Sequence, residues 1–412
     1  MSVIKPFCAY RPRPELARNV ASFPYDVLSS DEARELARGN PVSFLHVGKP
    51  EIDLDGSISL YDDRVYARGR ENLYRMISDG TLVRDPAPCL YVYQQRMGAH
   101  VQAGVVVACS VREYESGLIK RHEHTRRDKE DDRTRHVTET NAQAEPVFLA
   151  YRAHRTIDAL VDNVRGRPPV YDFVSTDGIG HALWVVSDRT EIDALVERFF
   201  EVPCLYVADG HHRTAAAVRH AQMTRGKHGG PGGQAPCETF MAVLFPHDQL
   251  RILDYNRLVK DLNGLTPDRL LERVGERFTV EPTATAKPAA ARTFGMLLDG
   301  RWHRLQARPG SFPDADPIKR LDVSILQDNL LAPVLGVVDP RTDKRIDFVG
   351  GIRGMGELER RCREGWAVAF SLHPTSLDQL MEVADAGQVM PPKSTWFEPK
   401  LRSGLTVRIL DE

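Results

Sequence analysis

The sequence predicts a mixed fold of helices and strands, of the α+β or mixed α/β class. Amphipathic helices with clear start and stop signals alternate with short, apolar, β-rich runs, and no internal repeat is present. The chain has 412 residues, of which 42% are hydrophobic and 27% charged, as in ordinary globular proteins with a substantial core. Because this length exceeds that of most single domains, we expect an N-terminal part, 1–236, and a C-terminal part, 237–412.

Capping residues mark the first helices. Ser29 and Glu32 have the spacing of a capping box, and Gly39 ends the helix that follows. A longer amphipathic helix ends at Gly80. The β-rich runs on both sides of "MGAH", 97–100, predict a β-hairpin.

Helices and strands continue to alternate through the rest of the chain. The Gly/Pro-rich segment 225–236 predicts a mobile loop, and the low-complexity segment 283–293 predicts a linker or surface loop. Apolar periodicity predicts helices at 153–164, 190–202 and 265–278, strands at 182–187 and 238–246, and two successive strand, turn and helix units after residue 345.

Charge and cysteine usage exclude several classes of partner. The formal net charge is −2, and lysine and arginine seldom form blocks, so we expect no binding to nucleic acid or to a membrane surface. Six cysteines without paired spacing indicate a reducing compartment. The N-terminus lacks the apolar run of a signal peptide, and no run is long enough to cross a membrane. We therefore expect a cytoplasmic protein with small-molecule partners, which could form an oligomer.

The segment "ADGHHRTAAA" is the clearest motif for anion binding. No Walker A motif is present, and no GxGxxG follows a strand. The apolar run before Asp209 and the alanine-rich helix after Arg213 place this segment at a helix N-terminus, where backbone N–H groups favour a phosphate. Gly210 lets the backbone approach a ligand closely. Asp209 stands where a carboxylate could hold Mg²⁺ or accept a proton, and the alternative is an N-cap with packed histidines.

The polar run "RHEHTRRDKEDDRTRH", 121–136, lies between two core-forming segments. From Thr125 onward, opposite charges four residues apart predict a solvated helix with an N-cap at Thr125. The "RHEH" part has two alternatives: a metal site formed by the HxH spacing, or a general base at Glu123. The basic residues around one carboxylate favour the base, as in a site for phosphoryl transfer.

The third segment, "MPPKSTWFEPKLRSG", covers residues 390–404. Its two prolines fix the backbone before a lysine and two hydroxyl-bearing residues, which suits a holder of phosphate or carboxylate groups. Trp396 could stack on a small ligand, and the alternative is a C-terminal loop whose aromatic side chains cap the core.

These segments, together with "YDVLS", "NPVSFLHV" and "NAQAEPVFL", resemble the large bacterial family catalogued as domain of unknown function ten-fifteen. More distantly, the glutamate segment followed by "DGHHR" is similar to free serine kinases of the ParB/sulfiredoxin-like fold, which transfer phosphate from ADP or ATP to L-serine. The chain departs from ParB proteins because His211 and His212 stand where their box has Glu and Arg, and no basic helix-turn-helix follows.

The resemblance implies a fold and a role for each motif residue. The fold would be a nucleotide-binding core of the ParB/sulfiredoxin-like type with elaborations. Glu123 would be the catalytic base, and Asp209 would assist through Mg²⁺ or as a second acid or base. The nucleotide-binding residues would be Gly210, His211, His212, Arg213 and Thr125, and the substrate-binding residues Arg121, His122, His124, Lys393, Ser394, Thr395 and Trp396.

We therefore expect a small-molecule kinase that makes O-phospho-L-serine from L-serine, with ATP or ADP as donor and Mg²⁺ as cofactor. Two other functions fit the same motifs. A nucleotide-gated binding protein would use the loop at Asp209 without transferring phosphate, and a metal-dependent hydrolase would use the histidines as ligands.

Overall fold

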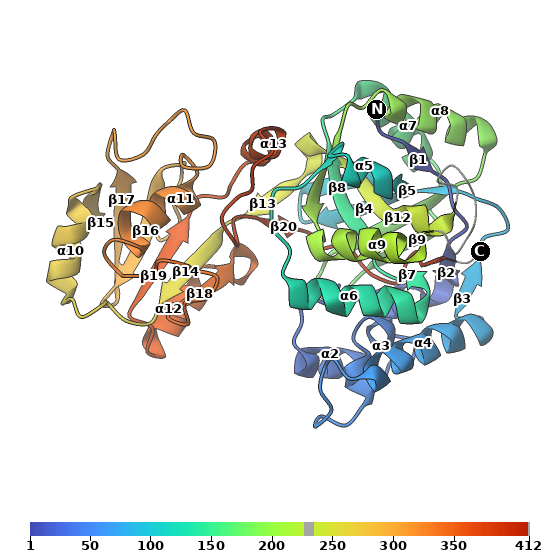
Figure 1. Cartoon of the computed structure of the whole chain (residues 1–412), viewed down its shortest axis with the longest axis horizontal. Coiled ribbons are helices and arrows are strands. Elements are labelled where there is room, and N and C mark those ends of the chain that lie inside the picture. The colour runs from blue at the N-terminus through green and yellow to red at the C-terminus, as the bar shows by residue number, and fades with distance from the viewer. Residues whose placement is uncertain (226–234, 411–412) are drawn as a thin grey trace. The chain divides into compact units, whose positions relative to one another are not determined.

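The computed structural model describes residues 1–225 and 235–410, which form two compact units (Figure 1). The first unit comprises Met1–Leu250 and Pro399–Glu412, and the second comprises Arg251–Glu398. The expected boundary between 236 and 237 therefore lies inside the first unit. Most of the expected mobile loop, residues 226–234, lies outside the described residues.

A large mixed sheet forms the centre of the first unit, with nine strands among the described residues. Its spatial order is β6 (Ile119–Lys120), β11 (Leu205–Asp209), β8 (Val147–Tyr151), β12 (Thr239–Pro246), β5 (His100–Ser110), β4 (Leu90–Met97), β10 (Gly180–Val186) and β9 (Tyr171–Val174), and β1 (Ile4–Lys5) pairs with β5. The pairs β6–β11 and β8–β12 are parallel, and the other neighbours are antiparallel. The expected hairpin is β4 and β5.

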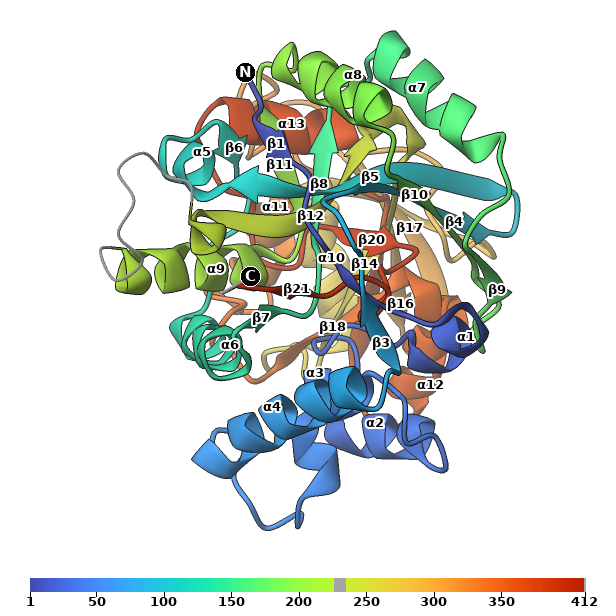
Figure 2. The ribbon, with the colours of Figure 1, turned by 90° about the vertical axis from the view of Figure 1, so that its right-hand side faces the viewer.

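Helices cover both faces of this sheet (Figure 2). On one face lie α7 (Arg155–Arg165) and α8 (Arg189–Phe200). On the other face α9 (His211–Thr224) packs on β8 and β12, and then α6 (Arg127–Thr140) and α4 (Asp63–Ser78) follow as successive layers. Apolar side chains of α7, α8 and α9 join those of the strands in one buried cluster, so burial of these helix faces holds the layers together.

Shorter elements complete the first unit. As predicted, the capping box is present: Ser29 Oγ accepts the Glu32 N–H at 3.2 Å, and the Glu32 carboxylate accepts the Ser29 N–H at 2.8 Å. The remaining helices are α1 (Ala17–Val20), α2 (Ser30–Ala37), α3 (Leu45–Gly48) and α5 (Val111–Glu115), and two small sheets pair β2 (Tyr10–Pro12) with β3 (Leu82–Arg84) and β7 (Ala142–Gln143) with β21 (Arg408–Ile409).

The second unit has its own antiparallel sheet. Its order is β15 (Phe278–Pro282), β17 (Arg301–Ala307), β16 (Thr293–Leu298), β19 (Val368–Leu372), β14 (Tyr255–Val259) and β18 (Ile346–Gly350). The helices are α10 (Pro267–Gly275), α11 (Asp322–Leu326), α12 (Met355–Arg363) and α13 (Leu377–Asp385), and β13 (Arg251–Leu253) pairs with β20 (Trp396–Glu398). The predicted alternation after residue 345 is confirmed as β18, α12, β19 and α13.

The prediction of a solvated helix after Thr125 is wrong for the inner face of that helix. Helix α6 begins at Arg127 with Arg126 as its N-cap, and it packs between α9 and α4. Its inner face is therefore buried although it is charged: Asp132 is 7% exposed and Arg133 is 9% exposed. Paired partners make this burial possible, because Asp132 accepts hydrogen bonds from Arg133 and from a tyrosine hydroxyl.

The predicted class is confirmed: the chain is a mixed α/β protein built around a large mixed sheet. All six cysteines are free thiols. Within 1–225 and 235–410, no helix has both the length and the apolar character needed to cross a membrane.

Candidate functional site

Two segments that are far apart in sequence meet at one edge of the large sheet. Strand β6 pairs with β11 in parallel, with Ile119 opposite Leu205 and Lys120 opposite Tyr206. Because parallel strands end at the same edge, the segments 121–125 and 209–213 both leave the sheet there. The parallel pairing thus brings the "RHEHT" and "DGHHR" motifs together.

His122 and His211 are in direct contact at this edge. Their rings meet edge to face with centroids 4.5 Å apart, and the residues are 1% and 6% exposed. Burial lowers the pKa of His122 to about 4, against a hydrogen bond with the Val207 backbone and the charge of Asp209, which act in the opposite direction. Burial and the neighbouring His122 ring hold the pKa of His211 well below its usual range. Both imidazoles are therefore neutral at neutral pH.

Glu123 completes this cluster. It is half-buried, and the ligand atoms of His122, Glu123 and His211 all lie within 4.8 Å of one another. A carboxylate beside two neutral imidazoles could act as a base, or the three groups could hold a metal ion together.

The N-terminus of α9 presents an anion-binding geometry beside this cluster. Its N-cap, Gly210, has φ of +91°, and no side chain caps the helix. A Cβ atom at Gly210 would lie 3.0 Å from Nε of Arg213, so the tight turn requires glycine. The backbone N–H groups of the first turn and the helix dipole favour a phosphate there.

Asp209 is held by an ion pair with Lys400, a residue that the sequence analysis did not select. The Lys400 Nζ donates to Oδ2 at 2.8 Å, and the Gly210 N–H donates to Oδ1 at 2.7 Å. Burial alone would raise the pKa of Asp209, but Lys400 and Arg213 hold it well below its usual range. Asp209 therefore stays ionised and is a weak base. Each of its oxygens accepts one of these hydrogen bonds, and the binding of Mg²⁺ by Asp209 stays a prediction.

Arg213 points into the first unit. Its guanidinium donates to the Pro146 carbonyl at 2.6 Å and lies 4.0 Å from the Asp26 carboxylate and 3.8 Å from the Asp209 carboxylate. It is 9% exposed, and although burial would lower its pKa, these carboxylates raise it above its usual value. These contacts of Arg213 stabilise the loop at residues 209–213, and the binding of phosphate by Arg213 stays a prediction.

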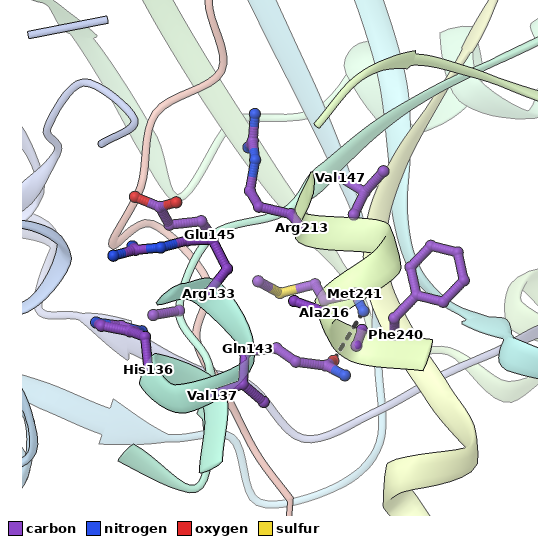
Figure 3. A pocket seen from close by; sticks show the side chains of 12 residues that line it. Arg133, His136, Val137, Gln143, Glu145, Val147, Arg213, Ala216, Phe240 and Met241 are labelled. Carbon is purple, nitrogen blue, oxygen red and sulfur yellow. Dashed lines mark hydrogen bonds between the residues drawn. The ribbon is translucent and has the colours of Figure 1, made fainter. Parts of the chain in front are cut away.

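A small cavity lies behind Arg213 (Figure 3). Its volume is about 30 Å³, which is room for roughly one water molecule, so it is too small for a nucleotide. Arg133 and Glu145 line it together with Arg213, and burial raises the pKa of Glu145 against the charges of the two arginines. The side-chain Oε1 atom of Gln143 accepts the backbone N–H of Met241 at 2.8 Å in the same wall.

Two further motif residues make hydrogen bonds at the start of α6. His212 Nε2 accepts the backbone N–H of Arg126 at 3.0 Å, and the Thr125 hydroxyl donates to Glu130 at 3.0 Å. Both contacts fix the segment that carries Glu123. Arg121 and His124 are exposed on the same segment.

Residues 390–398 of the last motif belong to the second unit, and residues 399–404 belong to the first. The Ser394 hydroxyl donates to the Pro391 carbonyl at 2.6 Å, and the Trp396 indole N–H donates to Glu398 at 2.8 Å. Lys393 has φ of +58°, an uncommon conformation for a non-glycine residue. Substrate binding by Lys393, Ser394, Thr395 and Trp396 stays a prediction.

Lys400 was not predicted as a site residue, although it lies in a segment that the sequence marks as a possible site. It lies in the same "MPPKSTWFEPKLRSG" segment as Lys393, but nothing in the segment indicates which lysine reaches Asp209. Asp26 and Glu145 lie in the "YDVLS" and "NAQAEPVFL" segments, and only their packing around Arg213 reveals their role.

The fold and site define a mixed α/β protein with a histidine-rich loop at the N-terminus of α9, beside a parallel strand pair. The chain belongs to the family described as "Protein of unknown function (DUF1015)", whose model matches residues 4–324. Among curated proteins, none matches this sequence.

Solved structures show a low level of similarity. A free serine kinase in complex with AMP has 14% identity and a TM-score of 0.35, and the match covers 74% of this chain and 91% of that one. SbnI with C-terminal truncation from Staphylococcus aureus has 11% identity and a TM-score of 0.39, covering 74% and 87%. A conserved hypothetical protein from Pyrococcus furiosus has 14% identity and a TM-score of 0.35, covering 74% and 95%. At these TM-scores the similarity does not establish a shared fold, so the ParB/sulfiredoxin-like fold stays a prediction.

Proposed function

We propose that the protein is a small-molecule kinase that transfers a phosphoryl group from ATP or ADP to the hydroxyl group of free L-serine. One observation carries the proposal: the parallel pairing of β6 with β11 sets Glu123 beside the uncapped N-terminus of α9. A base and a phosphate-binding loop at one site are the parts that phosphoryl transfer needs. The choice of L-serine follows from the resemblance of the two motifs to free serine kinases.

In the proposed reaction, the Glu123 carboxylate takes the proton of the substrate hydroxyl. The hydroxyl oxygen forms a bond to the terminal phosphorus in line with the bridging oxygen, and the bond to that bridging oxygen breaks, which releases the shortened nucleotide. The N–H groups of the first turn of α9 and the Lys400 ammonium offset the negative charge of the phosphates. Asp209 positions Lys400 through their 2.8 Å contact.

The direct test is formation of O-phospho-L-serine, followed by ³¹P NMR, from L-serine with ATP, ADP or CTP and Mg²⁺. We expect product with at least one donor. Glu123→Gln should reduce kcat by about a hundredfold or more while the nucleotide still binds, because general-base catalysis contributes about 10²–10⁴-fold. Glu139→Gln, on the exposed side of α6, is the matched control and should retain full activity.

A second variant tests the phosphate-binding role. Lys400→Met removes the ammonium but keeps the length of the side chain, so we expect at least a tenfold weaker binding of ADP by calorimetry. Lys400→Arg keeps the charge and should restore most of the affinity.

The same assays separate the kinase from the two other functions. Nucleotide binding without product from any donor would contradict the kinase and favour a nucleotide-gated binding protein. Release of inorganic phosphate or another hydrolysis product without L-serine would favour a hydrolase.

A further inference from the structure

Three metal-ligating side chains converge from two elements of the first unit. His122 and Glu123 follow strand β6, and His211 is the first residue of α9, with all ligand atoms within 4.8 Å of one another. His211 lies 88 positions after Glu123 in the sequence, and five strands, β7 to β11, lie between them. Their proximity is a property of the fold, not of a local sequence motif.

His211 differs from His136, His181 and His220, which are also buried in the first unit. Among the described residues its Nε2 atom is buried and has no hydrogen-bond partner, although the residue is only 6% exposed. By contrast, His136 binds a backbone carbonyl at 2.8 Å, and His181 and His220 bind hydroxyl groups at 2.7 and 3.1 Å. Buried polar atoms are almost always satisfied, so an imidazole nitrogen in this state points to a group that binds there.

We infer that His122, Glu123 and His211 form a binding site for a first-row divalent transition-metal ion such as Zn²⁺. Two imidazoles and one carboxylate are a ligand set that holds Zn²⁺ and leaves a fourth position open. Ligand atoms on one zinc ion lie roughly 3–3.5 Å apart, as follows from bonds of about 2 Å in tetrahedral geometry. Glu123 is half-buried on a segment outside regular structure, so rotation of its side chain can close the site.

The ligand chemistry separates this site from a Mg²⁺ site. Mg²⁺ prefers oxygen ligands and retains several waters, whereas two of the three groups here are nitrogen donors. The Asp209 carboxylate already accepts hydrogen bonds from Lys400 and from the Gly210 N–H. The cluster of His122, Glu123 and His211 is therefore a better metal site than Asp209.

Metal binding would also control the proposed reaction, and this consequence rests on the proposed function. A carboxylate that coordinates Zn²⁺ gives electron density to the cation and is a weaker base, so metal binding at Glu123 opposes its role as the base. Zn²⁺ is therefore expected to inhibit phosphoryl transfer, while the binding of the metal itself needs no kinase activity.

The test uses the full chain, stripped of metal with a chelator and titrated with Co²⁺. We expect one equivalent to bind with visible d–d absorption bands of a four- or five-coordinate site, and Zn²⁺ to displace it. Glu123→Gln and His211→Asn should each weaken Co²⁺ binding at least tenfold. Glu139→Gln, at an exposed position of α6, is the matched control for Glu123→Gln and should bind Co²⁺ as the unchanged chain does.

Each outcome separates the metal site from the kinase. If the unchanged chain binds neither ion, or if both variants bind Co²⁺ as tightly as it does, the metal site is overturned, whatever the result of the phosphoserine assay. Because Glu123→Gln alters a half-buried side chain, it keeps the test valid even where the His211 variant fails to fold. Metal binding without any phosphoserine product would retain the site and reject the kinase.

Discussion

At the scale of single residues, pairs of charges decide what each carboxylate can do. Asp209 and Lys400 are 191 positions apart, yet their side chains lie 2.8 Å from each other. From the sequence, an aspartate at the end of a strand resembles a metal ligand or a base. In the structure, Asp209 forms an ion pair with Lys400. Glu123 lies beside the imidazoles of His122 and His211, with the ligand atoms of the three residues within 4.8 Å of one another, and it is the base of the proposed reaction.

Asp322, at the start of α11, should make the stability of the second unit depend on pH. Its carboxylate accepts the Arg292 N–H at 2.9 and 3.0 Å and is 8% exposed. Burial raises its pKa to about 7 from the ordinary 3.8, against the hydrogen bonds and charge of Arg292. The folded state therefore binds the proton more tightly than the unfolded state. The resulting stabilisation is complete below about pH 4 and is lost as the pH rises through about 7.

We expect the free energy of unfolding of the second unit to fall by about 2–4 kcal/mol between pH 4 and 8. Asp322→Asn cannot ionise, so its unfolding free energy should vary much less over this range and exceed that of the unchanged chain at pH 8. Urea unfolding followed by tryptophan fluorescence measures this, because Trp302, Trp366 and Trp396 all lie in the second unit. Asp328→Asn, at an exposed position of the same segment, should keep the original profile, and equal profiles for both variants would refute the assignment.

At the scale of elements, α6 shows how packing overrides the polarity of a segment. Its sequence has almost no apolar residue, yet the helix forms the layer between α9 and α4. Arg133 lies 4.0 Å over the ring of Tyr25 and donates to Asp132 at 2.8 Å, and Asp132 also accepts the Tyr66 hydroxyl at 2.8 Å. The helix is held by ion pairs and aromatic contacts in place of an apolar stripe.

This arrangement predicts a large effect of one substitution in α6. Arg133→Ala leaves the buried Asp132 carboxylate without its ion-pair partner and removes the contact with Tyr25, so it should destabilise the first unit by about 3 kcal/mol. Arg127→Ala, at the exposed start of the same helix, should change stability by less than about 0.5 kcal/mol. Thermal unfolding of both variants would measure the difference, and equal melting temperatures would contradict the buried role of Arg133.

At the scale of the whole molecule, the chain leaves the first unit and returns to it. Residues 399–410 bring Lys400 and strand β21 back to the first unit, where Val407 and Ile409 join a buried cluster with Val20, Phe44 and Leu73. The second unit has a separate cluster around Leu258 and Leu297. Each unit therefore has its own source of stability.

A chain that stops after Glu398 tests this division. It loses the buried side chains of Leu401, Leu405, Val407 and Ile409, at about 1.5–3 kcal/mol each, which is comparable with the stability of a whole domain. Hydrogen exchange should therefore show loss of protection across the sheet of the first unit, and unchanged protection in β14, β16 and β19 of the second. Protection retained in the first unit would show that the returning segment is dispensable.

Much of the secondary structure follows from local signals. The capping box at Ser29, the hairpin around residues 97–100 and the helix after Gly210 depend on neighbours within a few positions, which the sequence displays directly. The start of α6 was misplaced by one residue, because Thr125 bonds to Glu130 and does not cap the helix.

The order of residues along the chain was enough to predict the mixed class, the elements and the motif that contains the histidines, because these depend on periodicity and residue type. It could not show that α6 would be buried, that Lys400 would pair with Asp209, or that His211 would meet His122 and Glu123. These features depend on which strands pair and in which direction. Since strand pairing joins distant segments through backbone hydrogen bonds that any residue can make, no local pattern encodes it.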